Sequence, residues 1–136
     1  MIHRSMLQPQ EIEVFYILPA LRKHLVVFMK ERGLKQKDIA KLLEIQDATV
    51  SQYLSAKRGH HIQFKGRVLD EIKTSAQRIT NQTTLLMETQ RLLKFIRESE
   101  VLCEIHHKFS VVPAICNPKT MGCTEREELI HVTTKA

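Results

Sequence analysis

The chain has 136 residues, enough for one domain and a small appendage, and its four glycines, four prolines and absence of tryptophan suit an all-helical protein. Its formal net charge of +6 favours a polyanionic partner. No stretch approaches the ~18 apolar residues of a membrane span, and the N-terminal residues lack the apolar region of a secretory signal. We therefore expect a cytoplasmic protein with no membrane partner.

The positive charge is concentrated in the first half of the chain. Residues 1–66 contain 11 Lys or Arg and 6 Asp or Glu, whereas residues 67–136 contain 10 and 9. The field that attracts phosphate groups therefore belongs to the first half.

The chain begins with a short arm, residues 1–10, followed by an apolar stretch from Glu11 to Leu18 that Pro19 interrupts. Proline is favoured in the first turn of a helix, so we predict a helix from Pro19 to Arg32 that ends at Gly33. Its buried stripe consists of apolar residues at helical spacing, namely Leu21, Leu25, Phe28 and Met29.

The stretch from Gln36 to Leu54 predicts two short helices joined by a tight corner at Glu44 and Ile45. Apolar residues recur at spacings of three and four on both sides of that corner. They are Ile39, Ala40 and Leu43 in the first helix, and Val50, Tyr53 and Leu54 in the second. This pattern is typical of a helix-turn-helix, whose second helix lies in the DNA major groove. The alternative is an ordinary helical hairpin with a polar outer face.

Polar side chains occupy the outward positions of the second helix, where they can reach base edges and phosphates. They are Gln46, Asp47, Thr49, Ser51 and Gln52. We expect the DNA sequence to be selected chiefly by Gln46, Asp47, Thr49 and Gln52. We expect phosphates to be held from the helix ends by Gln36, Lys37, Lys57 and Arg58.

Residues 36–59 resemble the helix-turn-helix core of XRE-type regulators, the lambda-repressor-like group. The matching features are Gln36, Asp38-Ile39-Ala40, the run from Thr49 to Leu54, and Lys57-Arg58-Gly59. Residues 17–22 resemble the lead-in of a group of archaeal XRE-type regulators. The resemblance implies a transcription regulator that binds double-stranded DNA. Such motifs usually have glycine at the corner, where this chain has Glu44, so we expect a reshaped or strained turn.

The remaining helical region begins after a connector, His60 to Phe64, in which Phe64 is expected to pack beneath the domain. The paired histidines of the connector either contact phosphate or metal, or are simply exposed. Two helices follow, from Gly66 to Thr80 and from Leu85 to Phe109, separated by a polar gap. We interpret residues 66–109 as a homodimerisation region; the alternative is that they cap the monomer core. Their densest apolar cluster is Leu92, Leu93 and Ile96.

Three cysteines and two histidines lie within 21 residues: Cys103, His106, His107, Cys116 and Cys123. Three thiolates and one imidazole, preferably that of His106, would form the four ligands of a metal centre. The irregular spacing favours an iron–sulfur cluster, with zinc as the alternative. The archaeal regulators that the chain resembles tend to carry C-terminal cysteines, in a C-x-x-C that is Cys103-x-x-His106 here. The alternative to a metal centre is that the thiols are simply buried as small apolar side chains.

We therefore expect an all-α protein with a lambda-repressor-like DNA-binding domain in residues 1–65, dimerisation helices in 66–109 and a cysteine-containing segment in 110–136. The expected function is a homodimeric transcription regulator that senses redox state, metal or iron–sulfur status. The alternative is an antitoxin or coactivator-like interaction module without a sensory metal. The sequence shows no nucleophile–base set, phosphate loop or substrate-pocket pattern, so neither an enzyme nor a small-molecule substrate is predicted.

Overall fold

The computed structural model describes residues 5–119 and 121–123, and every regular element within these residues is a helix. This confirms the all-α class. The elements are α1 (Pro9–Ile12), the π-helical turn η1 (Glu13–Ile17), α2 (Leu18–Glu31), α3 (Gln36–Leu43), α4 (Asp47–Leu54), α5 (Gly66–Arg78), α6 (Gln82–Glu98) and α7 (Val101–Phe109). No described helix is long and apolar enough to cross a membrane. Residues 1–4, 120 and 124–136, which belong to the predicted arm and C-terminal segment, lie outside the described residues.

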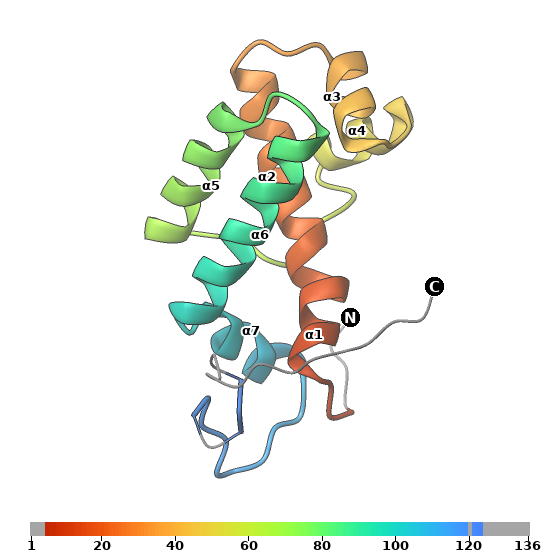
Figure 1. Ribbon diagram of the computed structural model, residues 1–136. Coiled ribbons are helices and arrows are strands. Elements are labelled where there is room, and N and C mark those ends of the chain that lie inside the picture. The colour runs from red at the N-terminus through yellow and green to blue at the C-terminus, as the bar shows by residue number, and fades with distance from the viewer. Residues whose placement is uncertain (1–4, 120, 124–136) are drawn as a thin grey trace, which may run out of the picture.

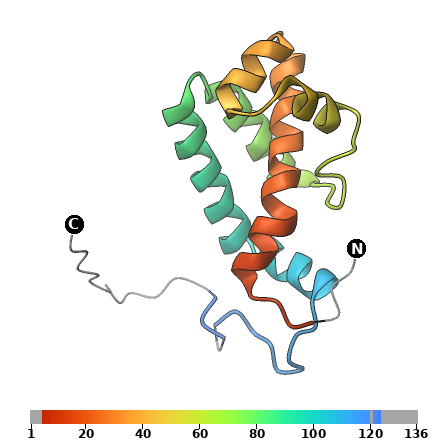
Figure 2. The same ribbon diagram turned by 90° about the vertical axis from the view of Figure 1, so that its right-hand side faces the viewer.

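A single helical rod, formed by α1, η1 and α2 over residues 9–31, organises the molecule (Figures 1 and 2). At 1.5 Å per residue it is roughly 35 Å long. Helices α5 and α6 lie along the rod, and α3 and α4 cover one end. Helix α7 and the cysteine segment lie at the other end. The candidate DNA-binding helices and the cysteines are therefore separated by most of the length of the molecule.

The rod continues through Pro19, where the sequence analysis expected an interruption. The physical reason is the π-helical turn just before it, in which the Leu18 N–H donates to the Glu13 carbonyl five residues earlier. A π turn is wider than an α turn, so it accommodates the proline ring against the preceding turn. Glu13 to Ile17 is therefore part of the long helix rather than a separate packing segment.

One hydrophobic core runs through all the helices, from Leu7 to Phe109. In α2 the predicted stripe is buried, apart from Phe28, which is only partly covered. The cluster Leu92, Leu93 and Ile96 of α6 is buried within the same core, against α5 and α7. These three side chains were expected to contact a second subunit, but the chain itself already covers them. Their packing corresponds to the alternative in which the later helices complete the monomer core.

The long helix predicted from Leu85 to Phe109 is in fact two helices, because the chain turns at Ser99 and Glu100. Glu100 has φ 65°, a left-handed conformation that costs a non-glycine residue ~1–2 kcal/mol. The turn brings α7 back against α1 and buries three large apolar side chains, each of which stabilises the fold by ~1.5–3 kcal/mol. These are Leu102, Ile105 and Phe109. Burial therefore outweighs the backbone strain.

Helix α6 begins three residues earlier than predicted, within the supposed polar gap. Asn81 caps it: the Thr84 N–H donates to Asn81 Oδ1 over 2.8 Å, and the Asn81 N–H donates to Thr84 Oγ1 over 2.9 Å. Such a reciprocal pair satisfies two backbone donors at a helix start. The polar residues that suggested a gap are the start signal of the helix.

Candidate functional site

Helices α3 and α4, here called the α3–α4 pair, are joined by a short corner at Glu44, Ile45 and Gln46. Glu44 has φ 55° and ψ 42°, the left-handed conformation usually taken by glycine at this kind of helix end. The Ile45 N–H donates to the Ala40 carbonyl over 3.0 Å, which closes the turn. The corner therefore keeps the glycine geometry, and Glu44 bears a strain of ~1–2 kcal/mol. Its Oε1 accepts a hydrogen bond from Gln82 of α6 at 2.9 Å.

The apolar faces of the pair lie where the sequence pattern placed them. Ile39 and Val50 are fully buried, and Ala40 and Tyr53 are buried nearly as deeply, whereas Leu43 and Leu54 are only partly buried. Both helices pack against each other and against α2. The opposite face of α4 is consequently turned away from the core.

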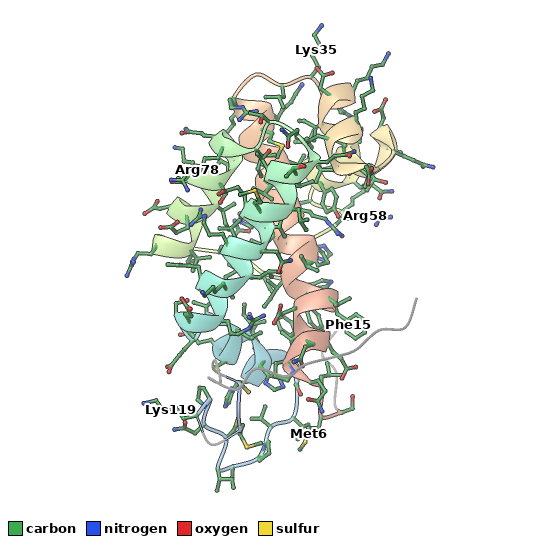
Figure 3. All side chains as sticks on the ribbon, viewed as in Figure 1. Met6, Phe15, Lys35, Arg58, Arg78 and Lys119 are labelled. Carbon is green, nitrogen blue, oxygen red and sulfur yellow. The ribbon has the colours of Figure 1, made fainter. Side chains whose placement is uncertain are left out.

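The candidate base-contacting residues lie on this outer face of α4 and at its N-terminus. Gln46, Asp47 and Ser51 are exposed, and Thr49 and Gln52 are half-buried. Five cations in and around the pair are exposed, namely Lys35, Lys37, Lys41, Lys57 and Arg58. Figure 3 shows Lys35 beyond the start of α3 and Arg58 beside α4, so positive charge lies on two sides of the pair.

Gln36 connects the two helices, a role that the sequence analysis did not anticipate. Its Nε2 donates to the Asp47 carbonyl over 3.1 Å and to Ser51 Oγ over 2.5 Å. Both acceptors belong to α4, so the amide holds the first turn of α4 against the start of α3. A polar residue at the start of the first helix, eleven residues before the second helix begins, is a weak sequence signal for such a bridge.

Gln52 and Arg58 form a pair at the other end of α4. Arg58 Nε donates to Gln52 Oε1, and the backbone N–H groups of Lys57 and Arg58 point at the Gln52 carbonyl, at 2.8 and 3.3 Å. Ala56 makes this return possible with φ 59°. The residue expected to contact bases and the residue expected to hold phosphate are thus bound to each other.

The connector after α4 runs across the rod. Gly59 is buried against α2, whereas His60 and His61 are exposed, with ring centroids 4.2 Å apart. Phe64 is buried, as expected, and packs edge-on against the ring of His24 at 5.3 Å. The histidines therefore match the interpretation of exposed connector residues.

The three cysteines are free, partly buried thiols. Burial raises the pKa of the Cys103 thiol, and the neighbouring Cys123, Glu100 and Cys116 raise it further. The return of Cys116 and Cys123 to within ligand distance of Cys103 stays a prediction.

Each of the two histidines of α7 forms a hydrogen bond with a main-chain carbonyl. His106 Nε2 lies 2.7 Å from the Leu7 carbonyl, and His107 Nδ1 lies 2.7 Å from the Cys103 carbonyl. A carbonyl only accepts, so each of these nitrogens donates. Leu7 is also held by its N–H, which donates to Ser110 Oγ over 2.8 Å. Within residues 5–119 and 121–123, no group of three or more His, Cys, Asp or Glu side chains is arranged to hold a metal ion, and the metal centre stays a prediction.

Comparisons of the chain with protein-family models, with curated proteins and with solved structures find no match.

Proposed function

We propose that the chain is a sequence-specific DNA-binding regulator of transcription that places α4 in the major groove of double-stranded DNA. The observation that carries the proposal is the α3–α4 pair, whose buried apolar faces leave a polar face of α4 exposed. Short polar side chains on such a helix can reach base edges, while flanking cations can reach phosphates. The resemblance of residues 36–59 to XRE-type regulators supports the same function.

Two sets of side chains carry the recognition in this proposal. The set that contacts bases is Gln46, Asp47, Thr49, Ser51 and Gln52. The set that contacts phosphates is Gln36, Lys37, Lys57 and Arg58. The amide of Gln36 already donates both of its hydrogens to Asp47 and Ser51, which keeps α4 in position for the first set. Gln36 therefore serves the phosphate set through its backbone N–H at the start of α3.

The pairing of Gln52 with Arg58 determines what Gln52 offers to a base. A glutamine recognises adenine through both its amide oxygen and its amide nitrogen. Here the oxygen already accepts from Arg58, so the amide of Gln52 presents donors. The oxygen keeps one lone pair, so the two N–H donors are the larger part of what Gln52 offers, and these donors suit the acceptors O6 and N7 of guanine or O4 of thymine. We therefore place a guanine or a thymine opposite Gln52.

The proposal includes a homodimer, because two-fold symmetry doubles the DNA contacts and sets half-sites about one helical turn, ~34 Å, apart. Since Leu92, Leu93 and Ile96 are already buried, the contact needs other side chains. Leu86 and Met87 of α6, 64% and 61% exposed, are the exposed large apolar residues between positions 66 and 109. We place the dimer contact on this part of α6. Sedimentation should show a dimer that Leu86→Glu dissociates; a monomeric unmodified protein at micromolar concentration contradicts it.

A sensory metal centre in this proposal rests on the three thiols. Cys116 and Cys123 act electrostatically on the Cys103 thiol, and thiolate is a strong ligand for zinc and for iron–sulfur clusters. Each imidazole can still offer its other ring nitrogen, His106 Nδ1 or His107 Nε2, because a ligating histidine commonly donates its second N–H to a main-chain carbonyl. The centre in this proposal is therefore held by the three thiols together with one of these free nitrogens, preferably that of His106.

Selection of binding sites from a random double-stranded DNA library tests the central proposal. We expect enrichment of one sequence, with a dissociation constant that weakens steeply as salt increases. The variant Gln36→Ala should weaken every site, because α4 loses its bridge to α3. Failure of the folded chain to enrich any sequence would refute the proposal and favour the interaction module.

A further inference from the structure

A cavity of about 490 Å³ lies between the connector and α7, on the flank of the rod. The connector crosses the rod on its way from α4 to α5 (Figure 1). The volume is within the range of sites for small organic ligands, ~300–1,000 Å³. We call this cavity the connector pocket. No part of the proposed DNA contact uses it.

The floor of the connector pocket is apolar. It is formed by Ile62, Phe64, Val68, Val101, Ile105 and Phe109. Phe109 is held in place by stacking on Tyr16, with ring centroids 4.3 Å apart. Such a floor favours a ligand with an aromatic or aliphatic body, because burial removes apolar surface from water.

The rim of the pocket is cationic. Lys65 and Lys108 both line it and are exposed, and neither forms an ion pair within the described part of the chain. Glu104 is the single carboxylate in the lining, so the lysines outnumber it.

The N-terminus of α5 adds to the same field. Lys65 is its N-cap residue, no side chain caps the helix, and no acidic residue lies in its first turn. The positive end of the helix dipole and the lysine charges therefore act together at the mouth of the pocket. An apolar floor with a cationic rim is complementary to an amphiphilic anion.

We infer that the connector pocket binds a small organic anion, a carboxylate or phosphate group on an apolar body, which acts as an effector of DNA binding. The anionic group lies between Lys65 and Lys108, and the apolar body lies on Phe64 and Phe109. The ligand then joins the connector, which begins at the end of α4, to α7. If the connector has two positions and the ligand binds one of them more tightly, the ligand increases the population of that position. Because the connector follows α4, the same shift changes the orientation of α4.

Calorimetric titration of the full chain tests the binding step. The probes are benzoate, octanoate and phenyl phosphate, with benzamide and octanamide as uncharged counterparts. We expect saturable binding of at least one anion and no measurable binding of its uncharged counterpart. Comparison of the carboxylates with phenyl phosphate identifies the anionic group. Equal affinity for benzoate and benzamide, or no binding of any probe, overturns the inference.

Charge-neutralising variants locate the site. Lys65→Gln and Lys108→Gln should each weaken anion binding about tenfold, the loss expected for one charge-assisted hydrogen bond. Lys30→Gln is the matched control, because Lys30 is an exposed lysine of α2 that does not line the pocket. Both rim lysines are exposed, so the variants should melt like the unmodified protein. Equal affinities in all three variants place the anion elsewhere and refute the site.

The effector role rests on the proposed function, whereas the binding itself does not. DNA affinity for the selected sequence should change at least threefold when the anion saturates the unmodified protein, and remain unchanged in the Lys65→Gln/Lys108→Gln double variant. Anion binding without an effect on DNA affinity overturns the effector role. A chain that binds the anion but no DNA sequence refutes the proposed function and leaves the ligand site intact.

Discussion

Gly59 lies so close to Pro19 that a Cβ atom on Gly59 would be 2.3 Å from the Pro19 carbonyl oxygen and 2.9 Å from the Cβ of Lys23. Gly59 also has φ 67°, a conformation that favours glycine. The contact is where the end of the α3–α4 pair meets the rod, directly before the connector. This contact therefore fixes the position of the candidate DNA-binding helices relative to the rod.

Gly59→Ala should destabilise the protein more than Gly66→Ala. Gly66 has a similar φ of 59°, but a Cβ there would have no neighbour within 4 Å. Both changes cost ~1–2 kcal/mol of backbone strain, and Gly59→Ala adds ~1–3 kcal/mol for the overlap with α2. Urea unfolding followed by circular dichroism measures both. Equal losses in the two variants would show that the close contact with Pro19 does not matter.

His24 should make the protein less stable as the pH falls below neutrality. Its ring is buried, Nδ1 donates to the Ala20 carbonyl at 2.7 Å, and Nε2 has no hydrogen-bond partner among the described residues. Burial lowers the pKa of His24 most, Lys23 lowers it further, and the bond to Ala20 opposes the shift. Below about pH 6.5 the unfolded chain therefore binds a proton that the folded chain resists, and stability falls.

The free energy of unfolding should decrease between pH 7 and pH 5, with at most ~1.4 kcal/mol per pH unit from this one group. His24→Leu should remove its part of the slope. His24→Gln, which can still donate to Ala20, is a second variant in case leucine prevents folding. If both variants keep the pH dependence of the unmodified protein, the slope belongs to other groups.

Arg58→Ala should change which base is preferred opposite Gln52. Without the arginine, the amide oxygen of Gln52 is free to accept from a base, so both halves of the amide can recognise adenine. We expect the selected sequence to shift toward adenine at one position by ~1–3 kcal/mol, with some overall loss of affinity. Lys57→Ala is the matched control, and it should weaken all sequences alike and reduce the salt dependence. Identical selected sequences for both variants and the unmodified protein would contradict the pairing.

Protein purified without oxygen should contain a metal if the three thiols form a centre. Iron would give a brown protein that bleaches in air, and zinc a colourless one that survives oxygen. Cys116→Ser should remove most of the metal, because thiolate is the stronger ligand, and His106→Gln should weaken metal binding, because it removes both the free Nδ1 and the ring that the Nε2 bond to Leu7 orients. Elemental analysis decides: less than about a tenth of an equivalent of iron and of zinc per chain would exclude the centre. Metal loss without any change in DNA affinity would make the centre structural.

Much of the fold could be predicted from local pattern. The faces of the α3–α4 pair, the buried stripe of α2 and the packing of Phe64 all follow from apolar spacing and composition. The exposed polar face of α4 follows in the same way, so the candidate base-contacting residues were predictable. These features depend on residues three or four positions apart, which the sequence places next to each other on a helix.

Where local signals had two meanings, tertiary packing decided. Proline commonly marks the start of a helix, but the π-helical turn before Pro19 keeps this proline inside the rod. The apolar run from Leu85 to Phe109 has no glycine or proline at its break. The chain turns at Glu100 because α7 can then bury Leu102, Ile105 and Phe109 against the rest of the core.

The sequence by itself determined the helical class, the α3–α4 pair and its polar face. Only the tertiary structure decided that α6 completes the monomer core and that the connector and α7 line a pocket. It also decided the side-chain hydrogen bonds from Gln36 to Ser51 and from Arg58 to Gln52. The physical reason is how far apart in the sequence the interacting residues are. Helical periodicity is set by neighbours within one turn, whereas the partner of an apolar face or an amide is chosen by segments far apart in the chain, through burial and hydrogen-bond satisfaction.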